Sequence, residues 1–438
     1  MAGPGTFEST VNRYPVSKDG HGELGTFEQE PAGGVPLIVR VLFALTCLQL
    51  AFLTPNITLI PHERSNLFSA LLCAVTLGYA LYRRPRCSFP GSRTEIVISF
   101  TLASLVILSG LSSRTPFSST LRGLTIVASG LGGFWCARLI LESVADKELF
   151  RNFCLGILTA LLGVCFWGYF TFGGVFQWVE LNPHPLATKI FLLCFAPLSL
   201  VLGRGSWAAI PAWALMFGSC VVFYLGGLRS GLFILVILAA VAAGFGLIRW
   251  KSLLVFLIPV IVAAIHFCHQ LPPSHRGLEY EPAYYRVESY PFSLHIALKH
   301  PWLGIGPTAP REEYLSDYDV KYPYVGKEDF AASVKKIRTS ENIFLTFMSE
   351  LGFPFVLLYS ASILVLVWRL IELTRAGGPP VPWHPAALFM PIAAALIHLN
   401  VYDGLMNPQV SWFFHILLGL VPMGKNHERK GNGAAAEH

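Results

Sequence analysis

Charged residues are scarce in this chain. Of its 438 residues, 13% are Asp, Glu, Lys or Arg, whereas ordinary soluble domains contain about 25%. Hydrophobic residues make up 53%, and the mean hydropathy is +0.55. This balance excludes an ordinary soluble protein, and the long apolar runs favour helices, because a helix satisfies its own backbone hydrogen bonds inside a bilayer. We therefore predict an all-α, polytopic membrane protein.

Paired cysteine and histidine motifs are also missing. The nine cysteines are scattered, most of them within apolar runs, and none shows the spacing of a disulfide framework or a zinc site. His266, His269 and His275 lack the close helical spacing of zinc ligands. The sequence therefore predicts no catalytic metal and no cofactor.

Apolar segments are long and numerous. A bilayer core of about 30 Å needs roughly 20 apolar residues per helix, which predicts about twelve transmembrane helices in this chain. Their expected centres are Leu42, Leu72, Ala103, Gly130, Ala160, Phe195, Leu215, Val236, Pro259, Tyr359, Ala394 and Leu417.

The net charge of +6 comes largely from short basic clusters between apolar segments. This pattern is typical of the positive-inside rule and makes nucleic-acid binding an unnecessary explanation. Because the clusters fall on alternate connections, we predict that both termini are cytoplasmic. The clusters lie at residues 82–86, 146–152, 203–207, 248–251 and 368–375.

The order of polar and apolar stretches predicts five regions. The first is polar and Gly-rich and lacks the features of a cleavable signal peptide, so we expect a disordered tail. The regions are a cytoplasmic tail (1–34), transmembrane helices 1 to 9 (35–267), a long external loop with active-site residues (268–341), transmembrane helices 10 to 12 (342–424) and a cytoplasmic tail (425–438).

The long loop is expected to be ordered and functional, since loops longer than about 15 residues in compact proteins are usually functional or disordered. Its segment YPFSLHIALKHPWLG, residues 290–304, has apolar residues at helical spacing, among them Phe292, Ile296, Leu298 and Trp302. This spacing predicts an amphipathic helix that lies across the membrane surface or over a cavity.

Two arginines on the expected outer side are candidates for anion binding. Arg229 lies in GGLRSGLF at the mouth of a span, and Arg286 lies in AYYRVESY. Arg229 could instead snorkel, with its guanidinium among the lipid headgroups. Arg286 could form a salt bridge with Glu288 or Glu281. Together the two guanidinium groups could bind a diphosphate, because each offers a planar fork that matches phosphate oxygens.

The stretch RTSENIFLTFMSELG, residues 338–352, places polar side chains at the start of an apolar span. Glu341 could be an anion favoured at a helix N-terminus, with Ser340 as the better capping residue, or a general base whose pKa is raised at the edge of a low-dielectric cavity. Asn342 could orient Glu341 or a sugar hydroxyl. Glu350 is expected to face the bundle interior, where a carboxylate is a functional candidate.

Two further polar residues lie at outer helix ends. His184 in LNPHPLATK and Asp403 in NVYDGLMNP are flanked by Asn and Pro, so turn chemistry explains them as readily as ligand binding does.

The order of four motifs resembles the O-antigen ligase and polymerase superfamily. They are NPHPLA, LRSG, a long loop with YYR followed by ALKHPWLGIGP, and ENIFLTFMSELGFPF. The resemblance covers roughly residues 180–365. The first five spans match only in hydropathy.

The resemblance implies a membrane glycosyltransferase of the GT-C type in the bacterial inner membrane. Such enzymes take a glycan from undecaprenyl diphosphate at the periplasmic face and transfer it to lipid A core, as ligases, or to another carrier-linked glycan, as polymerases of O-antigen or exopolysaccharide repeat units. The expected partners are therefore this donor, one of these acceptors and membrane lipids, with no nucleic acid. A transporter of lipid-linked glycans and a non-catalytic scaffold are the alternatives from other classes.

Carried over by motif, Arg229 and Arg286 would bind the diphosphate, and Glu341 occupies the position where the ligases usually have His before Asn. The resemblance assigns Glu341, Arg286 and Arg229 to catalysis. Asn342, His184 and His300 are assigned with both arginines to substrate binding. We expect a metal-independent O-antigen ligase, with the polymerase as the first alternative.

Overall fold

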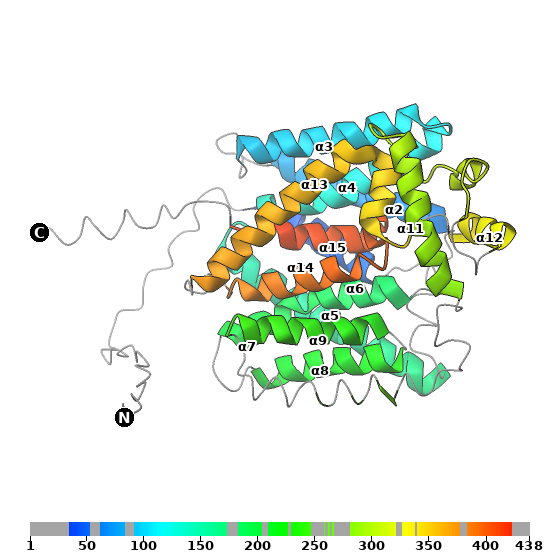
Figure 1. Ribbon diagram of the computed structural model, residues 1–438. Helices are drawn as coiled ribbons and strands as arrows, with labels where there is room; N and C mark the ends of the chain where they lie inside the picture. Colours follow the sequence, from blue (N-terminus) through cyan, green and yellow to red (C-terminus); the bar gives the residue numbers. More distant parts are fainter. Residues whose placement is uncertain are drawn as a thin grey trace, which may run out of the picture.

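A computed structural model describes most of the chain as helices (Figure 1). The described residues are 35–52, 62–83, 92–172, 183–203, 209–226, 229–246, 258, 262, 265, 266, 281–320, 326–337, 340–376 and 383–422. Within these ranges every regular element is a helix, which confirms the all-α prediction. Both expected terminal tails lie outside the described residues.

The helical bundle follows the apolar runs. It consists of α1 (Leu37–Phe52), α2 (His62–Arg83), α3 (Arg93–Ser112), α4 (Pro116–Ile140), α5 (Val144–Phe172), α6 (Pro183–Leu193), α7 (Phe195–Gly203), α8 (Ala209–Leu225), α9 (Arg229–Gly244), α13 (Ile343–Arg375), α14 (Ala386–His398) and α15 (Pro408–Gly419). The expected span centres fall within these helices, except Pro259, which lies outside the described residues.

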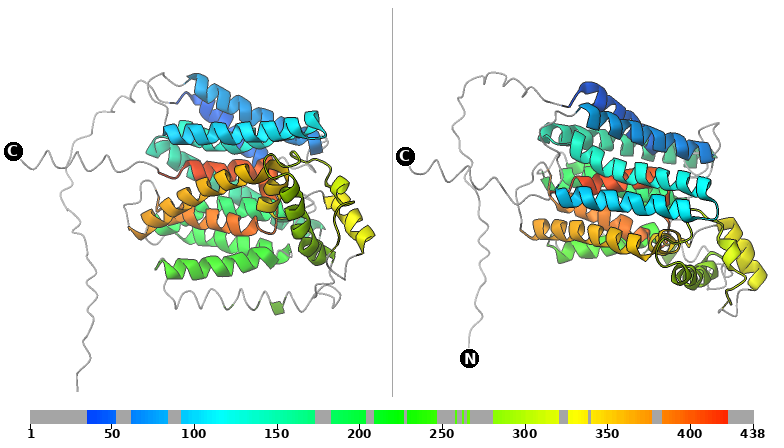
Figure 2. Two further views of the ribbon diagram at one scale, coloured as in Figure 1. Left: turned by 45° about the horizontal axis from the view of Figure 1, so that its top comes forward. Right: turned by 90° about the horizontal axis from the view of Figure 1, so that it is seen from above.

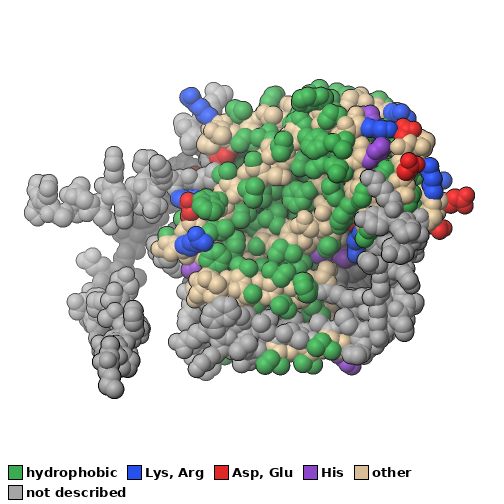
Figure 3. Space-filling view, in the orientation of Figure 1, with side chains coloured by type: hydrophobic (Ala, Val, Ile, Leu, Met, Phe, Trp, Pro, Cys, Tyr) green, Lys and Arg blue, Asp and Glu red, His purple; other side chains and the backbone are tan. Residues whose placement is uncertain are grey.

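Several helices are suited to a bilayer. Five apolar stretches are long enough to cross it, namely α3, α4, α5, α13 and the continuous stretch His184–Leu202 over α6 and α7, and other apolar helices have 10–17 residues. Figure 3 shows hydrophobic side chains over the middle of the visible face and charged ones toward its two ends. The chain is therefore a membrane protein, and the count of about twelve crossings stays a prediction.

Small residues let α4 and α15 pack closely at the centre of the bundle. A Cβ atom added to Gly133 would lie 2.6 Å from the carbonyl oxygen of Trp412, and one added to Gly419 would lie 2.5 Å from that of Phe134. Glycine is therefore required at both positions. Close backbone approach through small residues is a common way to associate helices in membranes.

The described part of the long loop forms a cap at one end of the bundle. Helix α11 (Glu281–Lys299) lies crosswise to the bundle helices, with the 3₁₀ helix η2 (Arg311–Tyr314) and α12 (Lys327–Ile337) beside it (Figures 1 and 2). The cap has its own small core, separate from the main one. That core contains Tyr285, Phe292, Ile296, Ile305, Ala309, Tyr314, Leu315, Tyr318, Phe330 and Val334.

The predicted amphipathic helix is present in this cap, but its apolar face is narrower than expected. Phe292 and Ile296 are fully buried in the cap core. In contrast, Leu298 is 65% exposed, and Trp302, which is 75% exposed, lies beyond the end of α11 at Lys299. The spacing therefore predicted the helix correctly, and two of the four apolar residues named for it are exposed outside the cap core.

Helix α13 runs from the cap toward the opposite end of the bundle, and it is broken near its start (Figure 1). Gly352 has φ 81° and ψ 170°, and Pro354 follows two residues later. Proline removes a backbone donor and clashes with the preceding turn. The backbone N–H of Phe353 instead donates to the carbonyl oxygen of Pro301 at 2.8 Å, so the break is where the cap joins α13.

Candidate active site

An ion pair joins the cap to the start of α13. Nε of Arg286, on α11, donates to Oε2 of Glu341 at 2.6 Å, although 55 residues separate the two in sequence. Their side chains are 31% and 23% exposed. Next to this pair, the hydroxyl of Ser289 donates to the carbonyl oxygen of Ser340 at 3.3 Å. Two contacts therefore hold α11 against the residues that precede α13.

The alternative of a local salt bridge between Arg286 and Glu288 is wrong. Glu288 is fully buried, and its Oε1 accepts a hydrogen bond from the hydroxyl of Tyr318 at 2.7 Å. The side chain of the other expected partner, Glu281, lies outside the described residues. The ion pair of Arg286 with Glu341 places this guanidinium beside a predicted catalytic carboxylate.

Glu341 is not the capping residue of α13. Its backbone is left-handed, with φ 54°, and the helix begins two residues later at Ile343. The expectation that Ser340 caps the helix is also wrong, because its hydroxyl donates to the carbonyl oxygen of Asn342 at 2.9 Å and contacts the hydroxyl of Thr346 at 2.7 Å.

Burial raises the pKa of Glu341 above its usual value, and the adjacent Arg286 offsets part of this shift. The two effects have opposite signs because a low-dielectric environment disfavours the carboxylate, whereas a neighbouring cation favours it. The carboxylate therefore has the raised pKa expected of a general base, and its exposed fraction allows contact with a ligand.

Asn342 caps α13. Its Oδ1 accepts hydrogen bonds from the backbone N–H groups of Phe344 and Leu345 at 3.0 and 3.1 Å. Its Nδ2 donates to the carbonyl oxygen of Asn400 at 3.1 Å, and the hydroxyl of Tyr290 donates to the same oxygen at 3.0 Å. Asn342 therefore fixes the start of the helix next to Glu341.

Tyr290 was not among the residues singled out in the sequence. It follows Arg286 by one helical turn and therefore lies on the same side of α11. The signal for it was the third tyrosine of YYRVESY, at the i+4 position from Arg286.

A second polar cluster surrounds His184 at the start of α6. Its Nδ1 lies 3.2 Å from Nε2 of His398, and its ring stacks on Tyr402 with 5.5 Å between centroids. The other ring nitrogen of His398 lies 2.8 Å from the hydroxyl of Thr188. The positive charge of Arg286 acts on both imidazoles.

His398 carries no signal in the sequence, because a single histidine in an apolar helix is more often a hydrogen-bonded core residue than a functional one.

The structure places the first residue of α9 near this cluster. Helix α9 begins at Arg229, and the hydroxyl of the next residue, Ser230, lies 3.5 Å from Nε2 of His398. The side chain of Arg229 itself is outside the described residues, so its predicted contact with a diphosphate remains a prediction.

His300 lies apart from the ion pair. It follows the last turn of α11, whereas Arg286 lies in its first half, about 20 Å away at a rise of 1.5 Å per residue. Its ring packs edge-on against Tyr314 with 5.3 Å between centroids. Burial and the nearby charge of Arg114 lower the pKa of His300. His300 therefore does not lie beside Arg286 and Glu341, with which it was predicted to bind the substrate.

Glu350 faces the bundle interior, as expected, and is fully buried. Its Oε2 accepts a hydrogen bond from the backbone N–H of Thr308 at 2.9 Å. Asp403 precedes the 3₁₀ helix η3 (Gly404–Met406), and its backbone carbonyl accepts from the N–H of Met406 at 3.0 Å, which fits the turn role predicted for it.

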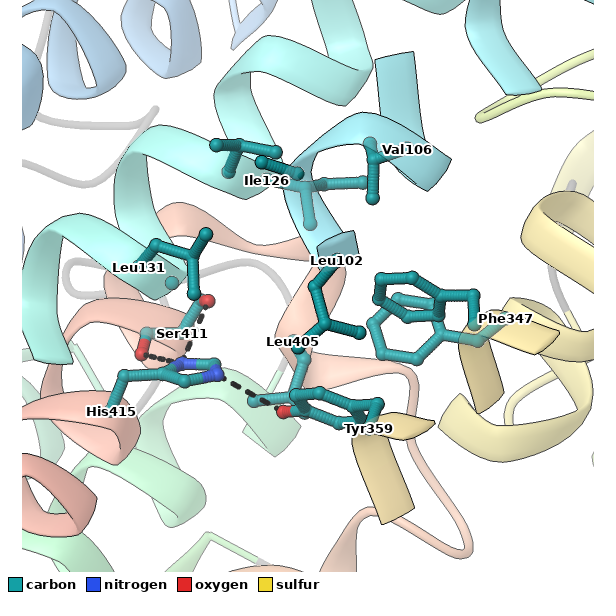
Figure 4. Close-up of a pocket in the computed structure, with 13 residues that line it drawn as sticks. Leu102, Val106, Ile126, Leu131, Phe347, Tyr359, Leu405, Ser411 and His415 are labelled. Atoms are coloured by element: carbon teal, nitrogen blue, oxygen red, sulfur yellow. Dashed lines mark hydrogen bonds between the residues drawn. The ribbon is translucent and has the colours of Figure 1, made fainter. Parts of the chain in front are cut away.

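A small apolar cavity of about 30 Å³ lies between α3, α4, α13 and α15 (Figure 4). Its polar wall is a hydrogen-bonded chain in which the hydroxyl of Tyr359 lies 3.1 Å from Nε2 of His415, and Nδ1 of His415 lies 2.7 Å from the carbonyl oxygen of Ser411. The remaining wall is apolar and includes Leu102 and Phe347. Of these residues, only Tyr359 was named from the sequence, as the expected centre of a span and not as a site residue.

Within the described ranges, no three His, Cys, Asp or Glu side chains gather as a set of metal ligands. Metal-independent chemistry remains a prediction from the sequence.

A family of known proteins matches the part of the chain that contains the ion pair of Arg286 and Glu341. Residues 189–360 match the family described as O-antigen ligase. This range includes Arg229, Arg286, Glu341 and Glu350, whereas His184 lies just before it. No curated protein matches the chain. The match over residues 189–360 supports the resemblance of this membrane protein to the O-antigen ligase and polymerase superfamily.

Proposed function

We propose that the chain is a metal-independent glycosyltransferase that transfers a glycan from undecaprenyl diphosphate to lipid A core, as an O-antigen ligase in lipopolysaccharide biosynthesis. The reaction takes place at the periplasmic face of the inner membrane, with both termini in the cytoplasm. The observation that carries the proposal is the ion pair between Arg286 and Glu341 within the matched region, because it places a phosphate-binding group beside a carboxylate of raised pKa.

Arg286 can bind a diphosphate without leaving the site. Its hydrogen bond to Glu341 uses Nε, and the two Nη groups lie on another edge of the planar guanidinium. This edge matches two phosphate oxygens bidentately. The side chain is 31% exposed, so a donor entering from the cap side can reach it. Arg229, the first residue of α9, supplies the second guanidinium in this proposal.

The two arginines stabilise the leaving group. As the bond between the anomeric carbon and the diphosphate oxygen breaks, its electron pair stays with the diphosphate, whose negative charge increases. Fixed cationic groups at this position lower the transition state more than the ground state.

Glu341 accepts the proton of the acceptor. In the proposed step the acceptor hydroxyl oxygen forms a bond to the anomeric carbon, and its proton passes to a carboxylate oxygen of Glu341. Diphosphate binding favours this transfer, because the ligand competes for Arg286 and brings negative charge close to Glu341. Both effects raise the affinity of the carboxylate for a proton.

The polymerase is the second candidate, and the observation that favours it is Glu341 itself. Ligases usually have His at this position, so a carboxylate is a departure from their pattern. In the polymerase the donor and the arginines keep their roles, and the acceptor is another carrier-linked glycan.

The test is transfer by the purified protein in detergent, with no ion gradient and with a strong chelator present. A labelled carrier-linked glycan is offered with lipid A core or with a second carrier-linked glycan. Product on lipid A core supports the ligase, and product only on the second acceptor supports the polymerase. No product with either acceptor, together with movement of the donor across a liposome membrane, would replace both with a transporter.

A further inference from the structure

A strained backbone residue outside the short first segment of α13, residues 343–351, lies next to each of its ends. Only two non-glycine residues in the described chain are left-handed, Thr308 with φ 55° and Glu341 with φ 54°. Glu341 precedes the segment, and Thr308 contacts Glu350 near its end. A left-handed backbone is unfavourable for a residue with a Cβ atom, and it persists where the surrounding contacts determine it.

The end of this segment is joined to the cap through main-chain hydrogen bonds. The N–H groups of Ile305 and Gly306 donate to the carbonyl oxygens of Ser349 and Glu350 at 3.0 and 2.9 Å. These carbonyls are available because the break at Gly352 ends the regular helical hydrogen bonding. We call this contact between residues 301–308 and 349–353 the α13 joint.

Backbone approaches backbone so closely in the α13 joint that side chains are excluded. A Cβ atom on Gly304 would lie 2.2 Å from the carbonyl carbon of Glu350, and one on Gly352 would lie 2.4 Å from the carbonyl oxygen of Trp302. Both glycines also have positive φ, 63° and 81°. The joint therefore has little freedom to adjust.

Glu350 adds a carboxyl group to the α13 joint. Its Oε2 accepts from Thr308, its backbone carbonyl accepts from the hydroxyl of Ser109 at 2.7 Å, and its Oε1 has no hydrogen-bond partner among the described residues. The positive charges of Arg311 and Arg122 act on this carboxylate. Replacing the carboxyl group with an amide would remove the negative charge that its ionised form places near two largely buried guanidinium groups.

Arg311 links this charge to α11. It is 2% exposed, donates to the hydroxyl of Ser293 and lies 5.5 Å from the ring centroid of Phe292. Ser293 lies two turns after Arg286, on the same side of α11. Arg311 therefore contacts the helix that holds Arg286, and its electrostatic interaction with Glu350 is the route by which a change at Glu350 would act on that helix.

We propose that Glu350 is a positioning residue that sets the distance between Arg286 and Glu341 through the α13 joint and Arg311. The proposal rests on the proposed transfer reaction. Glu350 is the last residue but one before the break, and it is about 10 Å along α13 from Ile343, the first helical residue after Glu341, at 1.5 Å per residue, so it acts through the cap and not on the acceptor proton. A displacement of about 1 Å in a reacting geometry can cost about 10²-fold in rate.

The test compares Glu350→Gln with Glu372→Gln, a matched control at the far end of α13, where Glu372 accepts from Trp368 and Arg369. Glutamine keeps an acceptor for Thr308 and removes the charge. For Glu350→Gln we expect kcat to fall by about 10- to 100-fold, while the KM for donor stays within about threefold of the wild-type value. The reason is that the substitution weakens the stabilisation of the transition state and leaves donor binding intact. Glu372→Gln should behave as wild type.

Hydrogen exchange measured by mass spectrometry supplies a readout that does not need activity. In Glu350→Gln, peptides covering 300–314 and 284–292 should exchange at least about tenfold faster than in wild type, whereas those covering 327–337 should not change. If Glu350→Gln accumulates poorly, Ser109→Ala, which removes one hydrogen bond to Glu350, should lower kcat severalfold with KM unchanged.

Unchanged kcat in Glu350→Gln would overturn the positioning role and leave the proposed function intact. A rise in KM at constant kcat would also overturn it, because that pattern reports donor binding. If wild type transfers no glycan to either acceptor, the proposed function fails instead. Hydrogen exchange of residues 284–292 in Glu350→Gln then still tests whether Glu350 holds α11 in place. The same exchange rate as in wild type would overturn the inference.

Discussion

Nε of Arg286 lies 2.6 Å from Oε2 of Glu341, and this ion pair connects the crosswise helix α11 to the start of the broken helix α13. The two groups have different requirements in the proposed reaction. Arg286 must bind the diphosphate through its Nη edge while it stays beside Glu341, and Glu341 must accept a proton from the acceptor. Each requirement gives a separate prediction.

Arg286→Ala should lower transfer by at least about 10²-fold, because an electrostatic group that stabilises the leaving group is lost. Arg286→Lys should recover less than about a tenth of the activity, because an ammonium group lacks the bidentate fork. Initial rates with the purified variants, at matched protein level in the membrane, check this. Near-full activity of Arg286→Lys would show that charge alone suffices. The same pair of substitutions at Arg229 tests the second guanidinium.

The pH dependence of transfer should follow Glu341. Its pKa is raised by burial, and the base works only when it is deprotonated. We therefore expect kcat/KM to fall as the pH decreases through this raised pKa and to be constant above it. A profile of kcat/KM against pH measures this limb. If the same limb persists in Glu341→Gln, another group is responsible for it.

Asn342→Ala should lower the stability of the purified protein by about 0.5–2 kcal/mol, because the capping hydrogen bonds to Phe344 and Leu345 are lost. Asn342→Asp keeps the capping oxygen and loses only the donor to Asn400. Thermal unfolding in detergent should therefore give a smaller decrease in Tm for Asp than for Ala. Equal decreases would mean that the contact with Asn400, and not the cap, carries the stability.

The orientation of the bundle can be measured at two exposed residues at opposite ends. Glu312 lies in the cap and Arg375 in the last turn of α13. With the native cysteines replaced, Glu312→Cys should react with a membrane-impermeant maleimide in cells whose outer membrane is permeabilised. Arg375→Cys should react only after lysis. The reverse pattern would place the cap in the cytoplasm.

Much of the fold was predictable because apolar runs of about 20 residues have few alternatives to helices in a membrane. Helix α11 was also predictable, since Phe292 and Ile296 are one turn apart and both are buried. Its packed face was not, because Leu298 follows the buried Ile296 by two residues, about 200° around the helix, and is exposed on the other face.

The contacts of the site were harder to predict. Arg286 had acidic neighbours two and five residues away, and spacing alone could not show that α11 would turn it toward Glu341 instead. Ser340 and Asn342 are both good capping residues, and only the start of the helix at Ile343 distinguishes them. The partners of Glu350 come from loop residues that no helical period describes.

The most direct measurement is transfer by Glu341→Gln, with Glu341→His and donor binding measured in parallel. Glutamine keeps the size of the side chain and loses the proton acceptor, so transfer should fall by about 10²–10⁴-fold while donor binding is retained. Glu341→His restores the residue usual in the ligases and should keep partial activity. An active Glu341→Gln enzyme would contradict the account, because the proton of the acceptor would then have to leave by way of another group.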